Sequence, residues 1–115
     1  MPLRTRPISW IRGARKDFED FPVEAQAEVL RALTIAAQGA MADIAKPLKG
    51  FGSGVFEVAL KHRGDAYRVV YAVQLADALW VIHSFQKKSK VGIKTPKAEL
   101  DVIEDRLKRL KEHLS

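Results

Sequence analysis

The chain has 115 residues, which is enough for one domain (residues 1–115) with a single modest core. Its composition, 47% hydrophobic and 30% charged residues, is typical of a globular protein. No apolar run approaches the roughly 20 residues of a membrane span and no signal peptide follows the basic N-terminus, so we expect a cytoplasmic protein without a membrane partner. The absence of cysteine excludes disulfides and thiolate metal sites, while the net charge of +6 favours a polyanionic or acidic partner.

The N-terminal third is predicted to form a short strand and a helical hairpin. A strand is expected over residues 8–11 and a short helix over residues 11–19. Pro22 begins a second helix, because the missing N–H of proline costs nothing in the first turn, and Gly39 is expected to end it. Apolar residues at helical spacing give this second helix one buried face: Ala25, Val29, Leu33 and Ala36.

Three consecutive strands are predicted at residues 55–61, 67–74 and 79–85. One face of the first strand is apolar, since Phe56, Val58 and Leu60 alternate with the residues between them. Short turns join the strands, so we expect an antiparallel meander.

A terminal helix is predicted to begin after Thr95, a suitable N-cap, with Pro96 at its first position. Its apolar residues form one stripe that packs either on the sheet, which we favour, or on a partner: Leu100, Ile103, Leu107, Leu110 and Leu114. The predicted fold is therefore α+β, with an N-terminal helical hairpin on a small antiparallel sheet and a C-terminal helix.

Positive charge is concentrated between Lys46 and Lys97, a stretch with only three acidic residues. Its candidate functional cations are Lys61, His62, Arg63, Arg68, Lys87, Lys88 and Lys90. No histidine–carboxylate spacing of a metal site appears, and we expect no cofactor. RNA cleavage without a metal needs a base for the ribose 2′-OH, cations for the phosphorane and an acid for the leaving 5′-oxygen, which such a set can supply.

Each of these residues also has a structural interpretation. Arg68 offers a planar fork for phosphate, or it lies on a solvated sheet face. Lys87 and Lys88 point to opposite sides of an extended strand, so one of them could join Arg68. A lysine base needs a lowered pKa, which neighbouring cations favour. His83 shares its predicted strand face with Leu79, Val81 and Phe85, so a buried histidine with satisfied hydrogen bonds is favoured over a catalytic one.

The aromatic residues are ambiguous in the same way. Tyr67 and Tyr71 lie on one face of the second predicted strand, where core packing of at least one is favoured and a stacking platform for an RNA base is the alternative. Core packing is also favoured for Trp10, Trp80 and Phe85.

Several segments resemble RelE-type toxins of bacterial toxin–antitoxin pairs, in particular the HigB-like, phage-associated branch. The motifs that carry the resemblance are Leu48-Lys49-Gly50, Val55-Phe56-Glu57, Tyr67-Arg68-Val69-Val70-Tyr71, and Phe85-Gln86-Lys87-Lys88 leading to Thr95-Pro96. The resemblance implies a RelE-like fold and a metal-independent, ribosome-dependent mRNA endonuclease that uses 2′-OH attack. It also implies three partners: a cognate helix-turn-helix antitoxin, the ribosome and mRNA.

By this resemblance, Arg68 contacts the scissile phosphate and Lys88 is the second phosphate-binding or acid residue. Well-studied members carry further lysines on the strand that here reads Glu57-Val58-Ala59-Leu60, so the nearest candidate for the base is Lys61. The predicted RNA-binding residues are Lys87, Lys90, Arg63 and Tyr71. Two alternatives stay open because fold does not fix function: a ParE-like inhibitor of DNA gyrase that does not cut RNA, or an inactive relative that binds nucleic acid or a partner.

Overall fold

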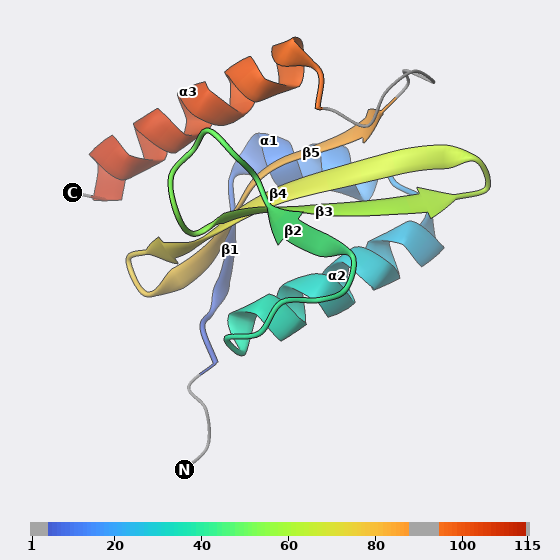
Figure 1. Ribbon diagram of the computed structural model, residues 1–115, viewed down its shortest axis with the longest axis horizontal. Helices are drawn as coiled ribbons and strands as arrows, with labels where there is room; N and C mark the ends of the chain where they lie inside the picture. The colour runs from blue at the N-terminus through green and yellow to red at the C-terminus, as the bar shows by residue number, and fades with distance from the viewer. Residues whose placement is uncertain (1–4, 88–94, 115) are drawn as a thin grey trace.

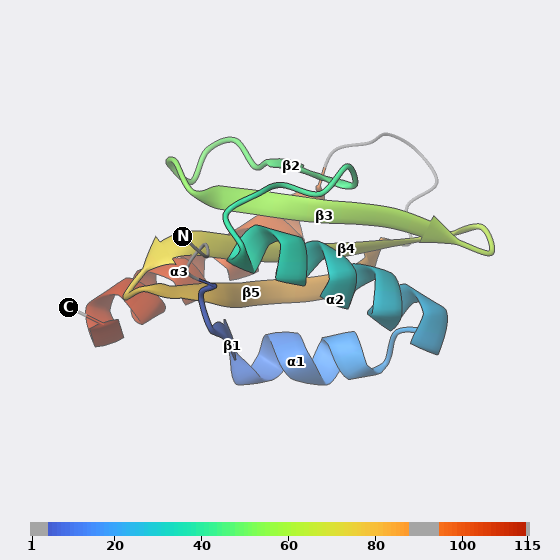
Figure 2. The same cartoon turned by 90° about the horizontal axis from the view of Figure 1, so that it is seen from below.

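A five-stranded sheet lies between two helical layers in the computed structural model, which describes residues 5–87 and 95–114 (Figures 1 and 2). The elements are β1 (Ile8–Trp10), α1 (Arg12–Glu19), α2 (Val23–Ala37), β2 (Ala45–Pro47), β3 (Val55–His62), β4 (Asp65–Leu75), β5 (Ala78–Lys87) and α3 (Lys97–Leu114). The strand order is β1-β5-β4-β3-β2. Helices α1 and α2 share one apolar cluster with the sheet, and α3 covers the opposite face with a second cluster.

The predicted α+β fold is confirmed, and so is the antiparallel meander of β3, β4 and β5. The sheet as a whole is mixed, because β1 pairs with β5 in parallel. Strand β2 was not predicted. It has only three residues, one of them Pro47, and it exists through pairing with the distant β3 rather than through a local pattern.

The helical hairpin forms as the apolar spacing predicts. Ala25, Val29, Leu33 and Ala36 are all buried against the sheet. Helix α2 ends at Ala37, and Gly39 follows in the left-handed region at φ +94°, a conformation that glycine adopts without a Cβ clash. A short turn at Arg63 and Gly64, both with positive φ, joins β3 to β4 and sets the register that pairs His62 with Asp65.

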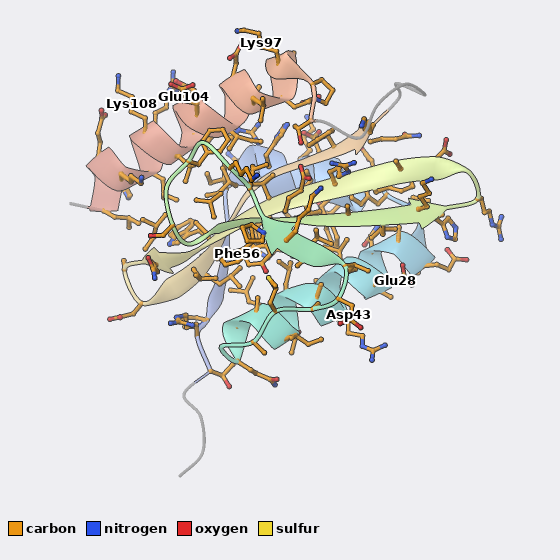
Figure 3. All side chains as sticks on the ribbon, viewed as in Figure 1. Glu28, Asp43, Phe56, Lys97, Glu104 and Lys108 are labelled. Atoms are coloured by element: carbon orange, nitrogen blue, oxygen red, sulfur yellow. The ribbon has the colours of Figure 1, made fainter. Side chains whose placement is uncertain are left out.

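Helix α3 packs on its own sheet, as favoured from its apolar stripe. Ile103, Leu107 and Leu110 are buried in the second cluster, and Leu100 and Leu114 pack against it. The labelled side chains of Lys97, Glu104 and Lys108 point away from the sheet in Figure 3. Within the described ranges, no helix combines the length and the apolar character that crossing a bilayer requires.

An irregularity between Val70 and Tyr71 changes which face of the sheet His83 occupies. Val70 pairs with His83 but Tyr71 pairs with Val81, so Ile82 is an extra residue on β5. The prediction that His83 shares a face with Leu79 and Val81 is therefore wrong. Those two residues pack toward α1 and α2, whereas His83 faces α3. A strand pattern with strict period two cannot reveal a bulge.

Candidate functional site: a cationic face of the sheet

Three of the predicted cations lie on the α3 side of the sheet, near the end where β5 finishes. Arg68 in β4 is paired across the sheet with Ala59 and Phe85, while Lys61 and Lys87 flank Ala66 in the adjacent row. The backbones of Lys61 and Lys87 are thus two strand spacings apart, roughly 10 Å, and Arg68 lies about 7 Å farther along the strand direction. This arrangement can surround one phosphodiester with positive charge.

A buried carboxylate lies on the same side of the sheet, one row beyond Arg68. Glu57 is 1% exposed, and its Oε1 accepts a hydrogen bond from Arg68 Nη1 at 2.7 Å. Its Oε2 accepts one from the Thr95 hydroxyl at 2.6 Å, which connects the start of the C-terminal helical segment to β3. Glu57 therefore fixes the orientation of Arg68 and compensates its charge inside the protein.

Sequence reasoning did not single out Glu57 as a site residue. The turn at residues 63–64 could have revealed Glu57. This turn sets the register of β3 against β4, and that register puts Glu57 diagonally across from Arg68 on one face of the sheet.

Lys87 is the lysine that joins Arg68. It is buried at 7% exposure and lies on the same face, two residues beyond Phe85, the residue paired with Arg68. Burial lowers the pKa of Lys87, and the positive charges of Arg68 and Lys46 lower this pKa further, while the Glu57 carboxylate opposes the change. A lysine with a lowered pKa gives up its proton more readily, so Lys87 is suited to proton transfer.

We expect Arg68→Gln to raise the pKa of Lys87, because the variant removes a nearby cation and leaves the Glu57 carboxylate to stabilise the ammonium form. The measurement is an NMR titration of the Lys87 side chain in protein labelled at lysine. Arg109→Gln on the exposed surface of α3 is the matched control and should leave the Lys87 midpoint unchanged. An unchanged midpoint in Arg68→Gln would show that the two side chains do not interact electrostatically.

Lys61 is exposed at the edge of this face. Arg63 lies outside the face and is exposed in the β3–β4 turn. Lys88 and Lys90 lie outside the described residues. In the part of the chain that the structure describes, no three histidine, aspartate or glutamate side chains gather closely enough to hold a metal ion.

Comparison with known proteins places the chain in a family. The sequence model of a family described as phage-derived protein Gp49-like matches residues 16–108. The chain belongs to this family. The predicted resemblance to the HigB-like, phage-associated branch of RelE-type toxins is thereby confirmed. A search of curated proteins finds no significant match to this Gp49-like protein.

A solved structure supports the same fold for the Gp49-like protein. It is a chain of the toxin–antitoxin complex RelBE2 from Mycobacterium tuberculosis, with a TM-score of 0.50 and 19% identity. The match covers 76% of the Gp49-like protein and 97% of the other chain. The RelE-like fold predicted from the sequence is confirmed.

Tyr71 lies in the core of the Gp49-like protein and not on the cationic face. It is 1% exposed, packs in the cluster beneath α1 and α2, and stacks on Phe56 with ring centroids 5.4 Å apart. The prediction that Tyr71 contacts RNA disagrees with this placement, and the core interpretation holds. Strand alternation could not decide this point, because both faces of the sheet are covered by helices.

Burial raises the pKa of Tyr71 to about 12. Between pH 10 and 12 the unfolded chain therefore loses a proton that the folded protein keeps, so this residue makes stability fall as pH rises. We expect the free energy of unfolding to drop by about 1 kcal/mol more in the parent than in Tyr71→Phe between pH 9 and pH 11. Urea unfolding at both pH values measures this difference, and equal losses would contradict the assignment of Tyr71 to the core.

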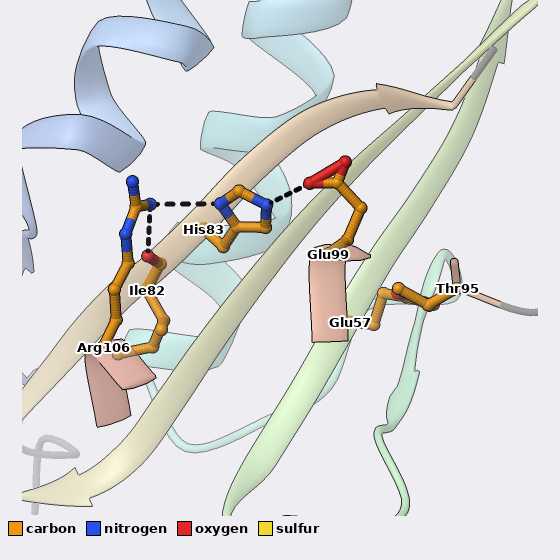
Figure 4. A network of polar contacts seen from close by, with 6 residues as sticks. All are labelled: Glu57, Ile82, His83, Thr95, Glu99 and Arg106. Carbon is orange, nitrogen blue, oxygen red and sulfur yellow. Dashed lines mark hydrogen bonds and ion pairs between the residues drawn. The ribbon is translucent and has the colours of Figure 1, made fainter. Parts of the chain in front are cut away.

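A second polar network connects α3 to β5 beside the cationic face (Figure 4). Arg106 Nη1 donates to the Ile82 carbonyl at 3.1 Å and contacts His83 Nδ1 at 3.0 Å. Because a guanidinium can only donate, Nδ1 accepts, and Nε2–H donates to Glu99 Oε1 at 2.7 Å. His83 is thus a buried histidine with both nitrogens satisfied, as favoured from the sequence, and it fixes the position of the first turns of α3.

Proposed function

We propose that this Gp49-like protein is the toxin of a type II toxin–antitoxin pair and that it cuts mRNA on the ribosome without a catalytic metal. In this reaction the ribose 2′-oxygen forms a bond to the adjacent phosphorus, and the bond from phosphorus to the 5′-oxygen breaks. The products are a 2′,3′-cyclic phosphate and a 5′-hydroxyl. The 2′-OH loses a proton and the leaving oxygen gains one.

The observation that supports this proposal is that Arg68 and Lys87 lie in adjacent rows on one face of the sheet. Arg68 would hold the nonbridging oxygens of the phosphorane, and Glu57 would keep its guanidinium in position. Lys87, whose pKa is lowered by burial and by Arg68, would protonate the leaving 5′-oxygen. Lys61 remains the candidate base, and Lys88, Lys90 and Arg63 remain candidates for binding the RNA backbone.

Mapping of mRNA 5′ ends after induction tests the proposal. Parent protein should produce discrete cuts in translated messages with 5′-hydroxyl ends, and a variant lacking Arg68 should not. Growth arrest without new mRNA ends, accompanied by loss of DNA supercoiling, would instead indicate the gyrase-inhibitor alternative. The absence of both effects at equal expression would indicate an inactive relative.

We further propose that a small helix-turn-helix antitoxin, encoded beside this chain, neutralises it. The net charge of +6 favours a partner that contributes an acidic segment. Co-expression with the neighbouring gene should restore growth, and the two products should co-purify.

A further inference from the structure

A hollow of about 990 Å³ opens between α1 and the strands β1 and β5. It is separate from the cationic face described above. Strand β1 pairs with residues 79–81 of β5, whereas Lys87 lies six residues beyond Val81, roughly 20 Å along the strand. A molecule bound in this hollow would therefore not need to touch Arg68 or Lys87.

The wall that α1 contributes is positively charged. Arg12, Arg15 and Lys16 are exposed, line the hollow and recur at spacings of three and four residues, which places them along one side of the helix. Among the described residues that line it, Glu19 is the acidic one, and it pairs with Arg15 at 3.6 Å. The hollow thus favours an anionic occupant.

The opposite wall is the outer edge of the sheet. The Leu79 amide donates to the Pro7 carbonyl, and the Ile11 amide donates to the Val81 carbonyl. In a parallel ladder the backbone N–H and C=O groups of every second residue point toward the neighbouring strand. Pro7 and Ile11 bond to β5, so the N–H and C=O groups of Ile8 and Trp10 point away from β5. Since β1 is the last strand of the sheet, these groups can pair with an extended peptide.

Two tryptophans complete the lining. Trp10 and Trp80 both border the hollow and offer apolar surface for a side chain of the occupant. The indole N–H of Trp80 is buried and has no acceptor among the described residues.

We propose that this hollow binds an acidic, extended segment of a protein partner, which adds a strand beside β1 and directs carboxylates to Arg12, Arg15 and Lys16. The exposed edge of β1 favours peptide over RNA. RNA could contact the cations and stack on the indoles, but it has no alternating amide and carbonyl groups to pair with Ile8 and Trp10. If the protein is a toxin as proposed, the segment belongs to its antitoxin, which would then anchor at a distance from the catalytic residues.

The test uses full-length protein and a fluorescent peptide of four glutamate–valine repeats. Fluorescence anisotropy should show saturable binding that weakens about tenfold in the double variant Arg12→Glu and Lys16→Glu. The matched control, Lys49→Glu with Lys108→Glu, makes the same change in net charge elsewhere and should bind as the parent does. In an added strand, every second peptide N–H faces β1 and the others face away. N-methylation of the set that faces β1 should abolish binding, and N-methylation of the other set should leave binding intact.

Failure of binding up to 1 mM peptide, equal weakening by both methylated sets, or equal loss in the control variant would overturn the proposal. Binding of an oligouridine that depends on Arg12 and Lys16, without binding of the peptide, would assign the hollow to RNA instead. The double variant Arg12→Glu and Lys16→Glu should keep the mRNA cleavage activity of the parent. The two proposals can therefore fail separately. A parent protein that does not bind the peptide but cleaves mRNA would refute only the proposal for the hollow. A parent protein that does not cleave mRNA would refute only the proposed catalytic function.

Discussion

Replacing Arg68 by alanine is expected to abolish growth arrest and to lower mRNA cleavage about a hundredfold. Arg68 is the guanidinium at the centre of the cationic face, held by Glu57 at 2.7 Å. Loss of one preorganised group that stabilises transition-state charge typically costs about 3 kcal/mol, which corresponds to that decrease in rate. Cleavage of a translated reporter message on purified ribosomes measures the rate directly.

The alanine variant alone does not separate catalysis from folding, because it leaves Glu57 buried without the guanidinium that compensates its charge. The double variant Glu57→Gln with Arg68→Met removes both charges while approximately preserving volume and keeping an oxygen for Thr95. We expect it to unfold at nearly the parental urea concentration and to remain inactive. Parental toxicity of this folded double variant would exclude Arg68 from the reaction.

Lys88 is expected from the sequence to be equally important, and Lys88→Ala should also abolish growth arrest. The geometry of the described residues makes Lys87 the matched comparison, since Lys87 shares the face of Arg68. Loss of activity in Lys87→Ala together with normal activity in Lys88→Ala would move the role of second cation to Lys87. The same cleavage assay distinguishes the two lysines.

Local patterns predicted most elements of this fold because each leaves a periodic trace in the sequence. The spacing of Val29 and Leu33 identified the buried face of α2, and the turn at Arg63 and Gly64 separated β3 from β4. Features that depend on pairing between distant segments left no such trace. Strand β2, the parallel pairing of β1 and the bulge beside Val70 all belong to this class.

The candidate site divides in the same way. Residue type and motif singled out Arg68 and Lys88, with Lys87 beside Lys88 as an RNA-binding candidate. The carboxylate that orients Arg68 required the cross-strand register. The assignment of Tyr71 depended on which of two covered faces it occupies, and composition cannot determine that. The bulge placed His83 opposite Glu99 and Arg106, which are distant in sequence.

Replacing Glu57 by alanine is expected to lower the free energy of unfolding by about 3–5 kcal/mol. The side chain is 1% exposed and its two oxygens bind Arg68 and Thr95. Its removal leaves a largely buried guanidinium without this counter-charge and releases the hydroxyl that precedes α3. Urea unfolding followed by circular dichroism measures the change. Glu28→Ala, at an exposed position of α2 labelled in Figure 3, is the control and should change stability by less than about 0.5 kcal/mol.

A double-mutant cycle separates the contribution of the ion pair from that of the contact with Thr95. If the counter-charge on Arg68 dominates, Glu57→Ala should cost far less in an Arg68→Met background, because the guanidinium that Glu57 compensates is then absent. The residual cost in that background combines two effects: loss of the hydrogen bond to Thr95, about 1.5–3 kcal/mol for a charged acceptor, and relief of the carboxylate that Arg68→Met leaves buried without its guanidinium. An equal cost in both backgrounds would mean that Glu57 acts chiefly by fastening the start of α3 to the sheet. In that case the position of Arg68 would have to be set by other groups.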